Sequence, residues 1–237
     1  MLRVRNCVDR LFVSKNVCKS HNIEHIDRCY RLLESSLKHS TSSIPERDVK
    51  IVSLATLLHD VDDRKLTDEN SPPNKNSVAI LTECEIDKDL ILEVLEVISW
   101  VSSSSNGDSV SEKCVEKPWL LYPRHVDRLD ALGVNGIRRA YQFTKTIHNP
   151  LFLDTTPKPF SKEDVWRIAT KERYQNYNGK SVSMIDHYYD KLLRLGDFET
   201  DNPFLRASQK DLIAPMVEVI LAFRDGELDD AYMSQFE

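Results

Sequence analysis

One stretch of the chain, Ile51–Leu58, constrains the fold more than any other. It reads Ile-Val-Ser-Leu-Ala-Thr-Leu-Leu, and His59 and Asp60 follow it directly, with two further carboxylates just beyond. Because apolar residues cover every side of a helix with this sequence, we expect the helix to be buried all round. A charged carboxylate at its buried end is costly unless a cation or hydrogen bonds compensate. The His59-Asp60 doublet therefore indicates either a metal site or a satisfied core pair.

Composition limits the classes of protein to which the chain can belong. Of its 237 residues, 41% are hydrophobic and 30% are charged, which suits a globular protein with a sizeable core. Only six glycines occur, which favours helices over turn-rich sheets. The formal net charge of −6 disfavours binding to a nucleic-acid backbone, and no stretch approaches the length of a membrane span. We expect neither nucleic acid nor membrane as a partner.

The five cysteines are scattered along the chain, and no pair has zinc-finger or redox spacing. Reduced thiols in a cytosolic compartment are the simplest interpretation of this pattern. The amino terminus has no continuous apolar run after its basic residues, so it does not resemble a signal peptide. The expected location is cytoplasmic.

Apolar residues recur at helical spacing along most of the chain, and no alternating strand pattern of useful length occurs. The prediction is an all-α protein with one domain over residues 1–237. A Pro-rich polar excursion is expected over 149–183, and loops over 61–73 and 102–117. The predicted helices lie near residues 3–16, 25–38, 46–60, 74–83, 87–101, from 118 onward, 134–147, 162–177, 184–195 and 203–224.

Residues that can bind a metal ion occur at the ends of several predicted helices. They are His25, His59, Asp60 and Asp127. Two imidazoles and two carboxylates suit a divalent ion of intermediate hardness, such as Mn, Fe, Co or Ni. No cysteine belongs to the set, which argues against a structural Zn site, and Mg stays open as an alternative.

The order of these residues resembles the H…HD…D pattern of the HD-domain metal-dependent phosphohydrolases, which fold as helical bundles. Two longer phrases, Leu57–Asp63 and Asp127–Gly133, match as well, and so does the late helix Ser183–Leu193. They resemble a bacterial, YpgQ-like subgroup that hydrolyses nucleoside triphosphates to the monophosphate and pyrophosphate. The resemblance covers about residues 20–195 and implies an HD-type helical domain.

The resemblance also implies the metal ligands, with some choices open. His21 lies four residues before His25, and either could be the first ligand; His25 is preferred because His-x-x-Arg leads a helix in the family. No histidine occurs between Asp60 and residue 125, which favours one metal ion over two. His125 stands where the subgroup usually has an acid. Asp130 is expected to lie behind Asp127 rather than on the metal.

The implied nucleophile is a metal-activated water, and Asp63 is the candidate to accept its proton. Asp63 comes about one turn after Asp60 if the helix continues that far. The alternative is a solvent-facing acid at the helix end.

Five residues are candidates for binding the substrate. Two basic residues could bind phosphates, and one turn of the late helix could stack a base and hold a phosphate. The alternatives are solvated charges or ion pairs for the basic residues and a core position for the tyrosine. The five candidates are Lys65, Arg128, His187, Tyr188 and Lys191.

The leading hypothesis is an enzyme that cleaves nucleoside or deoxynucleoside triphosphates at the α-phosphorus. The alternatives are a 5′-nucleotidase that releases phosphate from nucleoside monophosphates, and a nucleotide-binding regulator with little turnover. All three have a small-molecule nucleotide as partner. The oligomeric state is open, with a homodimer among the alternatives.

Overall fold

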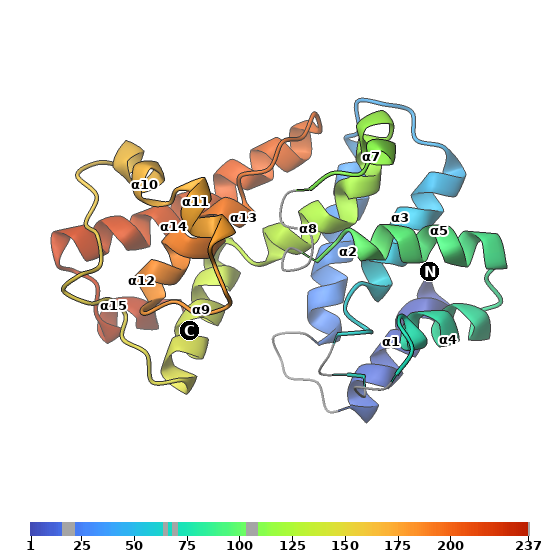
Figure 1. The fold of residues 1–237 in the computed structure, drawn as a ribbon, viewed down its shortest axis with the longest axis horizontal. Helices are drawn as coiled ribbons and strands as arrows, with labels where there is room; N and C mark the ends of the chain where they lie inside the picture. Colours follow the sequence, from blue (N-terminus) through green and yellow to red (C-terminus); the bar gives the residue numbers. More distant parts are fainter. Residues whose placement is uncertain (16–21, 64–65, 68–70, 103–108, 237) are drawn as a thin grey trace. The chain divides into compact units, whose positions relative to one another are not determined.

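The computed structural model describes residues 1–236 apart from 16–21, 64–65, 68–70 and 103–108. Every regular element among these residues is a helix (Figure 1), so the predicted all-α class is confirmed. None of the described helices is long and apolar enough to cross a membrane. The α-helices are α1 (Leu2–Ser14), α2 (Ile23–Lys38), α3 (Glu46–Leu58), α4 (Lys75–Glu83), α5 (Lys88–Ser99), α7 (Glu112–Glu116), α8 (Tyr122–Asp130), α9 (Gly133–Thr146), α10 (Lys162–Ile168), α11 (Lys171–Gln175), α12 (Met184–His187), α13 (Leu193–Leu195), α14 (Pro203–Asp225) and α15 (Asp230–Ser234).

Two further helical turns among the described residues are not α-helical, and both fall where the sequence predicts a plain α-helix. The residues from Pro118 first form a 3₁₀ turn, η2 (Pro118–Leu121), before α8 begins. A π-helical turn, η3 (Tyr188–Leu192), joins α12 to α13, so the predicted helix over 184–195 is continuous but not purely α-helical.

Three predictions of local structure were wrong. The predicted helix over 162–177 is two helices, because the Thr170 side chain accepts a hydrogen bond from the Arg173 amide and starts α11 anew. The predicted loop over 102–117 contains α7, and α15 was missed. Both missed helices have five residues, which is too few to show a helical repeat of apolar positions.

The described residues form two compact units. Unit 1 comprises Met1–Asp127 with Thr200–Phe204, and unit 2 comprises Arg128–Glu199 with Leu205–Glu237. Each unit is considered by itself below. The expectation of one domain over 1–237 stays a prediction.

Unit 1 is built around α3. Every residue of Ile51–Leu58 is buried, and α3 packs against α5, α2 and α1 (Figure 1). The Thr56 hydroxyl donates to the Val52 carbonyl at 2.8 Å, so this polar side chain is satisfied inside the apolar surroundings. The predicted all-round burial of this helix is confirmed.

The chain beyond α3 is held by Asp62. Its carboxylate accepts hydrogen bonds from the Asn76 amide at 2.8 Å, the Ser77 amide at 3.0 Å and the Ser77 hydroxyl at 2.6 Å. The Asn76 side chain in turn donates to the Val61 carbonyl at 2.7 Å. Free amides at the start of a helix need acceptors, and a carboxylate also suits the positive end of the helix dipole. Asp62 therefore caps α4 from 14 residues away in sequence.

In unit 2, the predicted excursion over 149–183 is fastened by the buried carboxylate of Asp186. Its Oδ2 atom accepts hydrogen bonds from the hydroxyls of Thr156 at 2.8 Å and Ser183 at 2.7 Å. Its Oδ1 atom pairs with Arg173 at 3.0 Å, and Arg173 also bonds Asp190 at 2.7 Å. Because the buried charge is fully paired, this network can hold an irregular segment in place.

The turn from α8 into α9 depends on glycine. Gly133 has a positive φ of 64°, a conformation that other residues adopt only with strain. A Cβ atom at Gly136 would lie 2.2 Å from the Ala131 carbonyl oxygen, so no larger residue fits there. The two glycines fix how sharply the chain turns after the Asp127–Gly133 phrase.

Replacing Asp62 by Ala should lower the free energy of unfolding by about 1–3 kcal/mol, because three hydrogen bonds to a charged acceptor are lost. Hydrogen exchange at the Asn76 and Ser77 amides should accelerate, while chemical denaturation followed by circular dichroism gives the stability. Asp9→Ala is the matched control: Asp9 forms only an exposed pair with Arg5 at 3.6 Å, so its loss should change stability by less than about 1 kcal/mol. Equal effects of the two variants would contradict the capping role.

Candidate metal centre

The first imidazole of the centre comes from α2. Asn22 caps this helix by accepting a hydrogen bond from the Glu24 amide, which places His25 in the first turn. The His25 side chain is only 3% exposed. An imidazole at the start of a helix thus points into unit 1.

The second imidazole and the first carboxylate come from the end of α3. His59 is the C-terminal cap of the helix, and its Nδ1 atom lies 2.9 Å from the Thr56 carbonyl oxygen. A carbonyl can only accept, so Nδ1 carries the hydrogen, and Nε2 of the neutral ring is left with its lone pair. This pattern, with one ring nitrogen held by a carbonyl, is typical of histidines that bind metals.

The four predicted ligands, His25, His59, Asp60 and Asp127, come together in unit 1. The two histidine Nε2 atoms are 3.1 Å apart. Both lie 3.5 Å from Oδ1 of Asp127, and carboxylate oxygens of Asp60 lie 3.5 and 3.6 Å from them. Three separate helices thus supply one compact group of nitrogen and oxygen atoms.

These separations fit a single divalent ion. Ligands about 2.0–2.1 Å from an ion lie roughly 3.0 Å apart when they are at right angles and roughly 3.4 Å apart in a tetrahedron. The observed separations of 3.1 to 3.6 Å begin within this range and exceed its upper end by about 0.2 Å. Two neutral imidazoles and two carboxylates also supply the charge that a divalent cation needs.

The same carboxylates act on His59 when no ion is bound. Burial lowers the pKa of this histidine, but the charges of Asp60 and Asp127 outweigh it and raise the pKa to about 10. Without an ion, His59 therefore carries a proton at neutral pH. That proton has to leave before Nε2 can bind a metal.

Cys29 is a neighbour of the centre that the sequence interpretation left out. Its sulfur lies 3.7 Å from Nδ1 and 3.8 Å from Nε2 of His25, and donor atoms of Cys29, His25, His59 and Asp127 all lie within 4.8 Å of one another. Because the two distances to His25 are nearly equal, the thiol lies beside the ring and not in line with the Nε2 lone pair. The available signal was the spacing of four residues, which puts both side chains on one face of α2.

Asp63 is placed by a turn and not by a continued helix. The helix α3 ends at Leu58, and the Asp63 amide donates to the Asp60 carbonyl at 3.1 Å. The helix predicted over 46–60 thus ends two residues early, and the condition for placing Asp63 one helical turn after Asp60 is not met. Asp63, three residues after Asp60, is exposed to solvent. Its catalytic role stays a prediction.

The other candidates are placed separately. Lys65 and His21 lie outside the described residues. Arg128 follows Asp127 in α8, is buried, and is the first residue of unit 2. Asp130, also in unit 2, is buried and lies 3.7 Å from the Arg139 guanidinium.

Three candidates, His187, Tyr188 and Lys191, lie in α12 and η3 of unit 2. Tyr188 is fully buried, the core position that the sequence left open as an alternative. His187 packs against the Tyr177 ring, with centroids 5.6 Å apart, and the Lys191 ammonium lies 5.5 Å from the same ring. Burial, with a smaller contribution from Lys191, lowers the pKa of His187 to about 4, so its imidazole is neutral at physiological pH.

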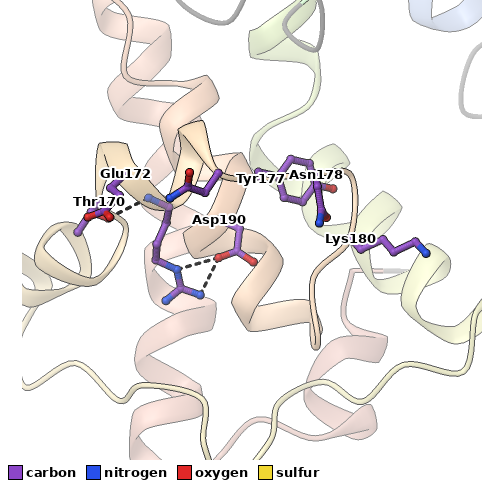
Figure 2. Close-up of a pocket in the computed structure, with 8 residues that line it drawn as sticks. Thr170, Glu172, Tyr177, Asn178, Lys180 and Asp190 are labelled. Carbon is purple, nitrogen blue, oxygen red and sulfur yellow. Dashed lines mark hydrogen bonds and ion pairs between the residues drawn. The ribbon is translucent and has the colours of Figure 1, made fainter.

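Tyr177 also lines a pocket of about 340 Å³ in unit 2 (Figure 2). Arg173 donates a hydrogen bond to Asp190 in the lining of this pocket, and Lys180, labelled in Figure 2, lines it too. His187 and Lys191 both lie against Tyr177, which lines this pocket. Whether they bind substrate stays a prediction.

No family model matches the sequence. The chain is 33% identical over 233 residues to the uncharacterized protein L803 of Acanthamoeba polyphaga mimivirus, which covers 91% of this chain and 93% of that protein.

Solved structures resemble the whole chain. An HD-superfamily hydrolase from Bacillus thuringiensis has a TM-score of 0.62 at 19% identity and covers 94% of this chain and 96% of its own. Bacillus subtilis YpgQ in complex with ADP has a TM-score of 0.60 at 22% identity and covers 94% of this chain and 95% of its own. The predicted HD fold is confirmed. The chain belongs to the same protein family as mimivirus L803 and has the fold of the HD-superfamily hydrolases.

Proposed function

We propose that the protein is a metal-dependent phosphohydrolase that converts nucleoside and deoxynucleoside triphosphates to the monophosphate and pyrophosphate. The observation that carries this proposal is the convergence of two imidazole nitrogens and two carboxylates within 3.1 to 3.6 Å. The resemblance to an HD-superfamily hydrolase and to an ADP-bound YpgQ supports a phosphorylated nucleotide as the substrate class.

His25, His59, Asp60 and Asp127 would hold the ion, for which Mn, Fe, Co or Ni is favoured over Zn, with Mg also compatible. When bound, the ion supplies a Lewis acid that activates water and offsets charge on a phosphoryl group. The Thr56 carbonyl keeps the His59 ring in one orientation. That fixed orientation lets the site bind without reorganising.

In the proposed reaction a water oxygen attacks the α-phosphorus, and the bond from this phosphorus to the α–β bridging oxygen breaks. Asp63 accepts the proton of the water, and pyrophosphate leaves with the bridging oxygen. A triphosphate carries more negative charge than one divalent ion offsets. Lys65, Arg128 and Lys191 are the proposed cations for the remaining charge, and His187 is the proposed contact for the nucleoside. Tyr188 is fully buried and keeps the core role instead.

Hydrolysis of a nucleotide panel in ¹⁸O-water with Mn²⁺ tests the bond that breaks. We expect label in the nucleoside monophosphate alone, with unlabelled pyrophosphate as the other product, because water attacks the α-phosphorus. Orthophosphate as the first product would instead favour a 5′-nucleotidase or another phosphatase. Tight nucleotide binding without any product would favour a regulator.

Replacing Asp127 by Asn should reduce turnover at least about 100-fold, since loss of an outer partner alone typically costs 10- to 100-fold. Asp130→Asn, three residues later in α8, is the comparison variant and should cost less, about 10- to 100-fold, because Asp130 is expected to lie behind the ligand. Pyrophosphate-release assays with and without added Mn²⁺, together with circular dichroism, separate loss of the ion from loss of the fold. Activity that survives in Asp127→Asn but not in Asp130→Asn would move the fourth ligand to Asp130.

Metal binding should compete with protons. The pKa of His59 is raised to about 10 in the ion-free site, so protons compete at every pH below that value. The apparent affinity for Mn²⁺ should therefore fall by up to about tenfold per unit as the pH is lowered from 8.5 to 6.5. Calorimetry in two buffers of different ionisation enthalpy should show proton release on binding. An affinity that is constant over this range would contradict the role of His59.

A further inference from the structure

Two cysteines that lie 77 residues apart meet in unit 1. Cys7 of α1 and Cys84, the C-terminal cap of α4, have sulfur atoms 3.8 Å apart. This distance is van der Waals contact between two free thiols, whereas a disulfide requires about 2.05 Å. Because α1 and α4 pack against each other, the fold itself holds the two sulfur atoms in contact.

The two thiols differ in a way that gives each a separate task. Cys7 is buried, whereas Cys84 is half-buried and can be reached by a small molecule. The Arg10 guanidinium lies 3.1 Å from the Cys7 sulfur and also bonds the Glu83 carboxylate at 2.5 Å. The Glu83 carboxylate also lies 3.6 Å from the Cys7 sulfur, so a cation and an anion both face this thiol.

We propose that Cys7 and Cys84 form a redox-active dithiol that reacts with low-molecular-weight disulfides. The Cys84 sulfur attacks one sulfur of an external disulfide, which releases one external thiol and leaves a mixed disulfide on Cys84. The Cys7 thiolate then attacks the Cys84 sulfur and expels the second external thiol. Overall, two protein thiols and one disulfide become one protein disulfide and two small thiols, so the external disulfide is reduced by two electrons.

The resting form of the pair is the dithiol. Burial and the hydrogen bond with Cys7 raise the pKa of the Cys84 thiol, so it is protonated at neutral pH. Attack on an external disulfide therefore proceeds through a small thiolate fraction. Closure by Cys7 is intramolecular and benefits from the contact that already exists.

The test treats the full-length folded protein with glutathione disulfide and follows its intact mass and linked peptides. The wild type should lose about 2 Da and yield a single Cys7–Cys84 peptide pair. Cys7→Ser should stop at the mixed disulfide, with a gain of about 305 Da on Cys84, because the second attack is missing. Cys84→Ser should form no cross-link, and Cys114→Ser, which removes another buried thiol, should behave as the wild type.

Three results would overturn the proposal. One is a wild-type protein that keeps glutathione on Cys84 while Cys7 stays free. Another is a cross-link from Cys7 or Cys84 to a different cysteine. The third is a native protein that does not react while the urea-unfolded protein does. Circular dichroism of each variant before oxidation confirms that the helices are intact.

Discussion

Eight consecutive residues of α3 have at most 5% of their surface exposed, so neighbouring helices must cover this helix on every side. The helices α1, α2 and α5 pack against α3 and cover it. The burial of α3 also fixes where His59 and Asp60 end up, because the first residues after a fully covered helix cannot reach solvent at once. The burial of an apolar segment thereby places two polar groups inside unit 1, where a cation can offset the cost of the carboxylate.

In the candidate centre, the carboxylates of Asp60 and Asp127 lie close to the buried His59 imidazole and raise its pKa strongly. Two imidazole nitrogens at 3.1 Å cannot both carry a proton without strong repulsion, and two carboxylates close by raise the proton affinity of His59. A proton is only a partial solution, since it satisfies one nitrogen at a time. A divalent ion would satisfy both nitrogens and both carboxylates together, which is the role that the proposed function gives these four side chains.

Much of this could be predicted from sequence, because helical periodicity and the separated H…HD…D phrases are local signals. The sequence pattern predicts His25, His59, Asp60 and Asp127 as one group, and the structure brings all four together. The remainder depends on tertiary packing. Nothing local ends α3 at Leu58 instead of Asp60, and nothing in a scattered set of cysteines shows that Cys7 touches Cys84. The five-residue helices α7 and α15 are hard to predict for another reason. They are too short to show the helical repeat of apolar residues, so only their cap residues could indicate them.

The capping bonds of Asp62 have a consequence for protein engineering. The phrase from His59 to Asp62 combines two functions in four residues, because one carboxylate faces the candidate centre and the other begins α4. A designer who grafted only the H…HD…D side chains onto another helical bundle would leave the turn after Asp60 unsupported. The smallest segment that could be transferred therefore includes α4, with the Asn76 and Ser77 groups that donate hydrogen bonds to Asp62. Neither of these two residues is a candidate ligand.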